Sequence, residues 1–302
     1  MNRPLMLVFT LVAVGLPVMA LAVKKQAAEI PLVSWTMLAV NETAQQADAH
    51  LIKTKEGKVL LIDVGYAGAD IVGHLKRHGV EKVDLILISH PHKDHYGGMH
   101  DLLKDNFKIQ RLVMNVPDKS VCDGEKPWGC DWADLNQVRQ EAQRRGAKVE
   151  QTAAGDVLFT EGEIKLQTLV AYNGVNSPAG RTDINDASVI ARLTAGPHKT
   201  LFTGDLNLVL GTYLAAHPAE LFADILKVPH HGTEGVAPNL FFDRVGASLA
   251  MVPAPKALWA SDRSKRIREY FSKRKVPVFV SGESGDVRVD FYAKEWKVSE
   301  AH

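Results

Sequence analysis

The stretch Leu85-Ile-Leu-Ile-Ser-His-Pro-His-Lys-Asp-His-Tyr-Gly-Gly98 decides the fold and the chemistry of this chain. Its opening residues, 85–89, are a short continuous apolar run, which is typical of a strand buried on both faces. Three histidines and an aspartate follow within six residues, and Pro91 and the glycine pair indicate a tight loop leading into a helix. Imidazole nitrogen and carboxylate oxygen are ligands of divalent metals such as Zn²⁺. The stretch therefore predicts a metal site at the end of a buried strand.

The four candidate ligands of this motif are His90, His92, Asp94 and His95. Four such side chains in one turn rarely bind a single ion, because adjacent residues point apart. Their spacing suits two neighbouring ions, with His90 and His92 on one and Asp94 and His95 on the other. A polar loop whose histidines bond only to the backbone would explain a single histidine, but it explains this cluster poorly.

Two later segments repeat the pattern of a strand that ends in polar side chains. Leu201-Phe-Thr-Gly-Asp205 ends in a carboxylate, and Ile225-Leu-Lys-Val-Pro-His-His-Gly-Thr233 contains the pair His230 and His231. Loops at strand ends are where layered α/β proteins gather their sites. A Gly-Asp pair alone is usually an ordinary turn, but beside the first motif Asp205 and the histidine pair become candidate ligands.

Short apolar runs alternate with helical segments along the rest of the chain, without a repeat or a low-complexity linker. Strands are predicted at residues 33–40, 50–54, 59–62, 83–89, 111–116, 164–169, 188–193, 200–203, 225–228, 249–252, 276–280 and 287–291. Helices are predicted at residues 69–78, 132–145, 206–216 and 261–273. This order favours helices packed outside two facing sheets, in a single α/β domain over residues 31–297.

The composition is that of an ordinary soluble globular protein, with 46% hydrophobic and 24% charged residues. It excludes a disordered chain, a collagen and a polytopic membrane protein. The formal net charge is +1, and removing residues 1–23, whose only charged side chain is Arg3, leaves 35 basic and 35 acidic residues. A uniformly basic surface for nucleic acid is therefore not supported, although nucleic acid remains a candidate partner beside a small-molecule or phosphoester substrate.

One local exception to this charge balance is residues 262–275, with seven basic residues and two acidic ones. The candidate phosphate contacts, if this predicted helix borders the site, are Arg263, Lys265, Arg266 and Arg268. The favoured alternative is a solvated helix face whose apolar side packs inward.

Residues 1–22 are predicted to be an export signal peptide. Arg3 supplies a positive start, residues 5–16 an apolar core, and Pro17 a break. Ala20-Leu-Ala22 then offers the small residues that a signal peptidase reads. The folded part is therefore expected outside the cytoplasm, in the periplasm or the extracellular space.

The alternative is an uncleaved membrane anchor, because residues 5–23 are just long enough to span a bilayer. Lys24 and Lys25 favour this alternative, since positive charge after an apolar run resists translocation. In an oxidising compartment, a disulfide between Cys122 and Cys130 is expected. That loop is either a rim of the active site or a stapled surface insertion, and both interpretations stay open.

The chemical motifs resemble the metallo-β-lactamase superfamily, through His-x-His-x-Asp-His at 90–95, Asp205 and the late histidine pair. More narrowly, they resemble the hydrolase domain of the DNA-uptake channel protein ComEC and its stand-alone relatives. The segments that carry this closer resemblance are 61–65, 89–98, Asn185-Asp-Ala-Ser188, 201–205 and 226–233. The resemblance implies an αββα sandwich with two metal ions at one edge.

The resemblance also implies how the metal ligands are shared. His90 and His92 would hold the first ion, Asp94 and His95 the second, and Asp205 would bridge them. One of His230 and His231 would bind the second ion and the other would meet the substrate. We prefer His230 as the ligand.

Two departures from the family pattern affect the site. The usual third histidine of the first ion is replaced by Asn185 and Asp186, so that Asp186 is a candidate weak ligand, with water as the alternative. Asn185 and Asp63 are further candidates, either for a weak contact with the metal or for a contact with the residues that bind it. The segment Ala44-Gln-Gln-Ala-Asp-Ala49 stands where ComEC-like chains often have Gly-Gln-Gly-Asp. His198, in Gly-Pro-His-Lys, is predicted to be a surface residue of a hairpin turn.

The predicted reaction is metal-dependent hydrolysis, most favourably of a phosphoester or phosphodiester. Two ions about 3.5–4 Å apart hold a hydroxide between them and polarise the bond to be broken. Asp94 would orient that hydroxide and accept its proton, and His231 would stabilise the transition state. The expected cofactors are two divalent ions, with Zn²⁺ first and Mn²⁺ second.

Two other functions compete with this one. The same hydroxide would hydrolyse a carboxylic derivative such as a lactone, thioester or β-lactam. An accessory or binding module with a degenerate site is the second competitor, although all the motif ligands are intact.

Overall fold

The protein is described by a computed structural model that covers residues 29–40, 45–125, 130–172, 177–217 and 221–301. The predicted signal peptide, residues 1–22, lies outside these ranges, and so does part of the loop between the two cysteines. Among the residues that the structure describes, no helix combines the length and the apolar character needed to cross a membrane.

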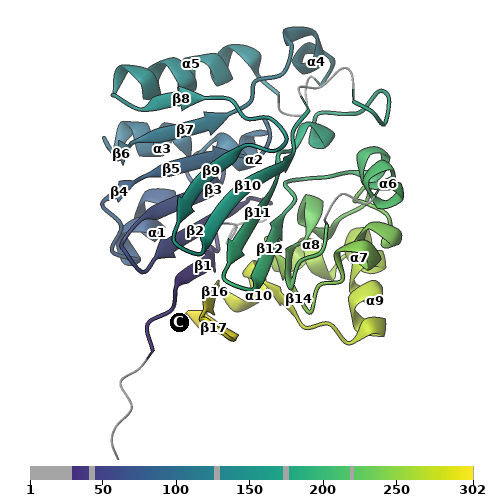
Figure 1. The fold of residues 1–302 in the computed structure, drawn as a ribbon. Coiled ribbons are helices and arrows are strands. Elements are labelled where there is room, and N and C mark those ends of the chain that lie inside the picture. The colour runs from purple at the N-terminus through teal and green to yellow at the C-terminus, as the bar shows by residue number, and fades with distance from the viewer. Residues whose placement is uncertain (1–28, 41–44, 126–129, 173–176, 218–220, 302) are drawn as a thin grey trace, which may run out of the picture.

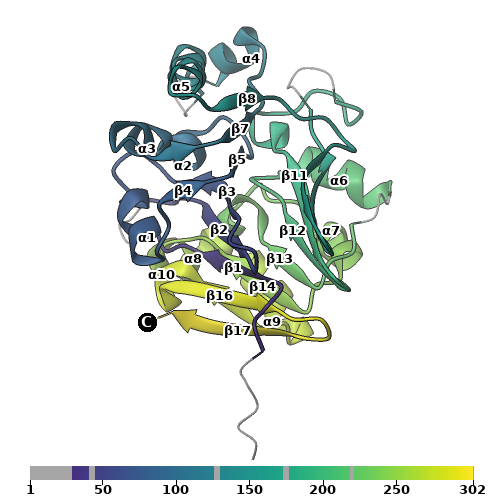
Figure 2. The same cartoon turned by 60° about the vertical axis from the view of Figure 1, so that its left-hand side comes forward.

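Two β-sheets pack face to face, and helices cover the outer face of each (Figures 1 and 2). The first sheet has the strand order β17-β16-β1-β2-β3-β5-β7-β8. Its strands are β1 (Val33–Met37), β2 (Ala49–Thr54), β3 (Val59–Val64), β5 (Leu85–Ile88), β7 (Arg111–Met114), β8 (Lys148–Glu150), β16 (Asp286–Phe291) and β17 (Trp296–Ala301). The second sheet has the order β15-β14-β13-β12-β11-β10-β9. Its strands are β9 (Val157–Glu161), β10 (Ile164–Val170), β11 (Ile190–Ala195), β12 (His198–Phe202), β13 (Ile225–Lys227), β14 (Leu249–Val252) and β15 (Val278–Val280).

The helices fall into two groups, one for each sheet. Beside the first sheet lie α1 (Ile71–Arg77), α2 (Lys93–Tyr96), α3 (Met99–Lys104), α4 (Lys119–Gly124) and α5 (Trp132–Arg144) (Figure 2). Beside the second lie α6 (Leu208–Ala216), α7 (Asn239–Val245), α8 (Lys256–Ala260) and α9 (Lys265–Arg274), and the short α10 (Ser281–Ser284) leads into β16. A small two-stranded sheet, β4 (Lys82–Val83) with β6 (Lys108–Ile109), completes the first layer. The predicted arrangement of two facing sheets with helices outside is confirmed.

The core between the two sheets is built from alternate side chains of facing strands. Trp35 of β1 and Phe202 of β12 are fully buried there, with ring centroids 4.9 Å apart. Two further apolar clusters fill the space between each sheet and its helices. The central strands are therefore buried on both faces, which explains why β5 and β14 read as continuous apolar runs.

The parallel strands position the chemical motifs. β3, β5 and β7 run parallel in the first sheet, as do β12, β13 and β14 in the second. Their carboxyl ends lead into the loops that contain the histidines and Asp205. The motifs, which are up to 141 residues apart between His90 and His231, therefore meet at one edge of the sandwich.

Sequence reasoning missed β8, β9 and β17, and all three are edge strands. An edge strand is partly exposed, so its apolar pattern is weak. β17 also continues past the predicted domain boundary at residue 297.

The prediction for His198 was wrong. Gly196, with φ +57°, makes the hairpin turn, and His198 already belongs to β12. Its side chain is buried, and its ring centroid lies 6.2 Å from that of Phe291. The turn is thus one residue earlier than the Gly-Pro-His pattern suggested, and the histidine packs into the sheet.

Candidate metal centre

The first motif turns from a strand directly into a helix. β5 ends at Ile88, and α2 begins at Lys93, so His90 and His92 lie in the connecting loop while Asp94 and His95 lie on the helix. The turn between α2 and α3 packs so closely on the end of β3 that a Cβ at Gly98 would collide with the carbonyl oxygen of Val64. Glycine is therefore required where the helix meets the sheet.

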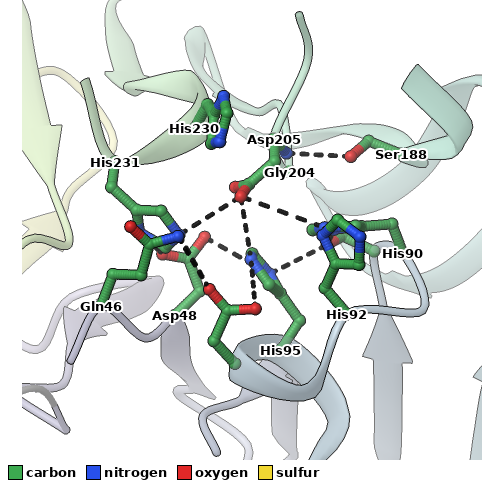
Figure 3. A network of polar contacts seen from close by, with 12 residues as sticks. Gln46, Asp48, His90, His92, His95, Ser188, Gly204, Asp205, His230 and His231 are labelled. Carbon is green, nitrogen blue, oxygen red and sulfur yellow. Dashed lines mark hydrogen bonds and ion pairs between the residues drawn. The ribbon is translucent and has the colours of Figure 1, made fainter. Parts of the chain in front are cut away.

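Four predicted site residues, Asp94, His95, Asp205 and His231, converge at this edge, and Figure 3 labels the last three. The Nε2 atoms of His95 and His231 lie 3.3 and 3.2 Å from Oδ2 of Asp205. Nε2 of His231 is also 3.3 Å from Oδ2 of Asp94. One ligand atom from each of the four residues lies within 4.8 Å of the other three. This spacing is compatible with a shared cation.

The donor atoms of this cluster fit a divalent metal. Nε2 of His95 and Nε2 of His231 are buried, and within the described ranges neither has a hydrogen-bond partner. An unsatisfied buried polar atom is costly, and it calls for an explanation such as an ion. Both nitrogens face carboxylate oxygens, the donor combination that zinc and manganese accept.

His90 and His92 lie beside the same aspartate. Nε2 of His90 is 4.0 Å from Oδ2 of Asp205 and 3.1 Å from Nδ1 of His92. Burial lowers the pKa of His90 well below its usual value and also lowers the pKa of His92. Both rings are therefore held in the neutral form that can bind a metal.

His230 and His231 point in different directions because both adopt left-handed backbone angles. Their φ values are +48° and +53° in the turn η2 (Pro229–Gly232). The ring of His231 is buried among the carboxylates, whereas Nδ1 of His230 lies 2.6 Å from Oδ1 of Asn207. The structure thus brings His231, rather than His230, among the other candidate ligands.

Asp186 is not placed as a metal ligand. Its Oδ1 accepts a hydrogen bond from the backbone N–H of Asn207 (2.8 Å), and its Oδ2 accepts one from Leu210 (3.1 Å). Both oxygens therefore bind backbone amides at the start of α6, which ordinarily lack helical partners. Burial raises the pKa of this carboxyl to about 6. Asn185 lies beside it in η1 (Asn185–Ala187), and its Oδ1 is buried with no hydrogen-bond partner among the described residues.

Asp63 supports His95 from behind. Its carboxylate accepts hydrogen bonds from the backbone N–H and the hydroxyl of Ser89, both 2.7 Å long. Nδ1 of His95 donates to the same carboxylate at 2.8 Å. A carboxylate behind a histidine fixes its tautomer, so that the far nitrogen is left for a metal. This placement agrees with the outer role expected for Asp63.

Sequence reasoning missed three residues that contact the cluster. Asp48 is fully buried, with Oδ1 3.2 Å from Nδ1 of His231, and it forms an ion pair with the buried Lys227. Gln46 donates from Nε2 to Oδ2 of Asp94 over 3.2 Å. The sequence contained a signal for two of these residues. In Gln45-Gln-Ala-Asp48, the glutamine and the aspartate of the Gly-Gln-Gly-Asp pattern are kept as Gln46 and Asp48, and only the two glycines are replaced. Lys227 was visible as a charge within a buried apolar strand.

The carboxylates and imidazoles of the cluster hold each other in the charged form. Burial raises the pKa of the Asp205 carboxyl, but the charges of His231 and His95 outweigh this and hold it well below its usual value. Burial lowers the pKa of His95, but Asp205 and Asp63 outweigh it and hold that pKa well above its usual value. A divalent cation bound here would replace the imidazole protons as the positive partner of these carboxylates.

The disulfide loop is connected to this site. Cys122 and Cys130 form the expected disulfide, with Cα atoms 5.0 Å apart. Glu125 accepts a hydrogen bond from the N–H of Ile184 (3.4 Å), and the preceding Asp183 accepts one from the side chain of Asn207, which in turn meets His230. These contacts favour the interpretation that the loop borders the site.

The basic helix α9 uses its arginines within the fold. The guanidinium group of Arg266 donates to the carbonyl oxygens of Val236 and Ala237, both at 2.8 Å. That of Arg268 donates to the carbonyl oxygens of Ser261 and Trp259. The placement favours the solvated-helix alternative over phosphate binding by these two side chains.

Comparisons with known proteins show which families and folds this chain is similar to. The model of the metallo-beta-lactamase superfamily matches residues 43–118. The chain is 25% identical over 219 residues to ComE operon protein 3 of Bacillus subtilis (strain 168), covering 72% of this chain and 26% of that protein. It is 21% identical over 258 residues to the uncharacterized protein YcaI of Escherichia coli (strain K12), covering 82% and 29%. The chain thus spans between a quarter and a third of the length of these relatives.

Among solved structures, the metallo-beta-lactamase fold protein YhfI from Bacillus subtilis is similar. Its TM-score is 0.53 at 15% identity, and the match covers 88% of this chain and all of that one. This likeness supports the fold. Together with the sequence matches, it confirms the resemblance inferred from the motifs.

Proposed function

We propose that the chain is a metal-dependent hydrolase of the metallo-β-lactamase superfamily and that it hydrolyses phosphodiesters outside the cytoplasm. The observation that carries the proposal is the convergence of Asp94, His95, Asp205 and His231, with the buried Nε2 atoms of both histidines facing carboxylates. The phosphodiester class is supported by the ComEC-like motifs.

Two positions for metal ions follow from the side chains. Asp94, His95, Asp205 and His231 would hold one ion, and His90 with His92 would hold a second beside Asp205. A bound divalent ion would polarise a phosphoryl oxygen and lower the pKa of a water molecule toward neutrality. The histidine-rich donor set favours Zn²⁺ and also accepts Mn²⁺.

Asp94 is the residue proposed to handle the proton of the attacking water. Its side chain is 20% exposed, which makes it the ligand of this cluster that solvent can reach. Gln46 donates to its Oδ2, so the carboxylate is held in place. A fixed, partly exposed carboxylate at the cluster can orient a water molecule and accept its proton.

His230 is proposed to meet the substrate. The side-chain amide of Asn207 donates to Asp183 over 2.8 Å, so its oxygen faces His230 and accepts from Nδ1. This fixes the tautomer of His230 and leaves Nε2 at the partly buried rim. An imidazole at this rim is placed to contact a phosphoryl oxygen.

Location outside the cytoplasm is supported by the N-terminal pattern and by the disulfide. If the proposal holds, mass spectrometry of protein from a periplasmic or secreted fraction will give Val23 as the first residue. Full-length protein in the membrane fraction would instead favour the anchor.

A metal-reconstituted activity screen tests the reaction. Purified protein loaded with Zn²⁺ or Mn²⁺ is expected to hydrolyse bis-p-nitrophenyl phosphate or single-stranded DNA, and Asp94→Ala should lose at least about a hundredfold in rate. Asp105→Ala, which removes an exposed carboxylate paired with Lys76, is the matched control and should keep full activity. Turnover of a lactone or of nitrocefin alone would overturn the substrate class, and the lack of bound metal would favour an accessory module.

A further inference from the structure

A buried ion pair lies directly behind the candidate metal centre, and the proposed reaction gives it no role. Lys227, at the end of β13, and Asp48, just before β2, are both fully buried. Nζ of Lys227 donates to the carbonyl oxygen of Gly204 over 2.7 Å and pairs with Oδ2 of Asp48. The two residues come from different sheets, and they meet only because the sandwich closes.

Stability alone is a weak reason for such a pair. A fully buried ammonium and a fully buried carboxylate both lose their hydration, and well-packed apolar side chains of similar volume are often as stable or more stable. Each partner also makes a contact with a proposed metal ligand, and those contacts offer a reason for keeping the charges.

Lys227 distinguishes the two oxygens of Asp205. Nζ lies 3.5 Å from Oδ1, whereas Oδ2 lies 3.3 Å from Nε2 of His95 and 3.2 Å from Nε2 of His231. The backbone of Asp205 is fixed as well, because its N–H donates to Oγ of Ser188 over 2.9 Å. The ammonium group therefore turns one oxygen away from the cluster and leaves the other facing both imidazoles.

Asp48 acts on the histidine side of the cluster. Its Oδ1 lies 3.2 Å from Nδ1 of His231, which also approaches the carbonyl oxygen of Pro253 at 2.8 Å. Two acceptors at Nδ1 keep a proton on that nitrogen, so Nε2, which faces Asp94 and Asp205, is the nitrogen left for a metal. Asp48 thus orients the candidate ligand His231 without being a metal ligand itself.

Asp48 also belongs to a second acidic group that overlaps the first. Asp48, Asp63 and His95 have ligand atoms within 4.8 Å of one another, and His95 is common to both groups. In this second group the cation is already supplied by the chain, since Lys227 pairs with Asp48. The ammonium group neutralises the deeper carboxylate, and this leaves the group around Asp205 for a metal ion.

We propose that Lys227 and Asp48 are positioning residues of the metal centre. Lys227 orients Asp205 and serves as an internal counter-cation for Asp48, and Asp48 orients His231. As a unit they keep divalent metal out of the deeper group that contains Asp48 and Asp63. This inference rests on the proposed metal dependence of the site, but it is independent of the substrate.

Binding of Co²⁺ to metal-free protein tests the proposal, by calorimetry and by the visible absorption of the bound ion. Lys227→Met and Asp48→Asn should each weaken Co²⁺ binding at least about tenfold and alter the spectrum, because the ligands are no longer oriented. The double variant Lys227→Met/Asp48→Asn removes the pair without leaving an unpaired buried charge, so it is the variant expected to fold. Its affinity for Co²⁺ should be no higher than that of the single variant with the lower affinity, since the two residues act as one unit. Lys273→Met, at an exposed position of α9, is the matched control and should behave as wild type.

A folded double variant with wild-type affinity, stoichiometry and spectrum would overturn the proposal, because the pair would then only fill space. The same conclusion follows if the single variants unfold while the double variant binds Co²⁺ normally. These outcomes are separate from the proposed function. If wild type binds Co²⁺ but hydrolyses no phosphodiester, the proposed substrate fails, and the effect of the pair on metal binding is still measured.

Discussion

The inner and outer halves of the candidate site both present histidines, but these histidines are held in different ways. The inner half, His95, Asp205 and His231, is fully buried and contacts charged groups behind it. Nδ1 of His95 faces Asp63, and Nδ1 of His231 faces Asp48 and a backbone carbonyl.

The outer half, His90, His92 and His230, has neutral partners instead. Nδ1 of His90 meets the hydroxyl of Ser89, Nε2 of His90 meets His92, and Nδ1 of His230 meets the amide of Asn207. A charged partner raises the basicity of a metal-binding imidazole more than a neutral one does. Histidines that look alike in sequence are therefore expected to differ in metal affinity. The inner half should bind a metal ion first and more tightly than the outer half.

The largest expected effect separates the two adjacent histidines. His231→Ala should lower metal affinity and activity by at least about a hundredfold, because it removes a buried ligand of the inner half. His230→Ala should keep the tightly bound ion and lose mainly catalytic rate. Elemental analysis after dialysis, combined with kinetics, checks both. The proposed difference between the inner and outer halves would be wrong if His230→Ala loses the ion and His231→Ala retains it.

A smaller effect is expected from the carboxylate behind His95. Asp63→Asn should weaken the inner ion by about 10- to 100-fold, because an amide supports the imidazole less well than a carboxylate. Asn207→Ala is the matched change behind His230, in the outer half, and should leave metal content unchanged. Calorimetric titration of the metal-free variants gives both values. Equal losses in the two variants would mean that the halves do not differ.

Stepwise removal of metal tests the comparison without a mutation. With a chelator added gradually, one ion per chain should leave at about tenfold lower chelator concentration than the other. The spectrum of the Co²⁺ protein identifies the ion that stays, and the change should match the one caused by His92→Ala. Loss of both ions in a single step would contradict an ordered site.

The smallest effect on metal is expected at Asp186, whose oxygens bind amides of α6. Asp186→Asn should leave metal affinity unchanged, and it should instead alter how stability depends on pH. Burial raises the folded-state pKa of Asp186 to about 6, above the value of about 4 for an unfolded chain. The carboxyl therefore contributes stability below about pH 4, and this contribution is lost as the pH rises through 6.

Relative to the variant, the free energy of unfolding of the wild type should fall by roughly 2 kcal/mol between pH 4 and pH 7. Urea unfolding of the metal-free proteins at both pH values measures this difference. Parallel pH profiles for the two proteins would mean that the carboxyl does not titrate in this range, and a loss of metal in the variant would restore Asp186 as a ligand.

Much of the site could be predicted because strand and turn patterns are local. The apolar run at 85–89 and the glycine pair after it fix a strand, a loop and a helix start, and with them the general place of His90 to His95. The edge strands β8, β9 and β17 were missed because partial exposure weakens their apolar pattern. Asp48 was missed because its partners lie in other elements, far away in the chain.

The sequence by itself determined the two-sheet fold, the edge at which the motifs meet and the residue types available to a metal. These follow from apolar periodicity and from polar residues at strand ends, which act over a few residues. Only the tertiary structure decided that His231 faces the cluster while His230 faces Asn207. It also decided that the carboxylate of Asp186 accepts hydrogen bonds from backbone amides of α6, and that Lys227 pairs with Asp48. Each of these depends on where a side chain points once distant elements pack, and packing in a buried, low-dielectric interior determines which polar groups become partners.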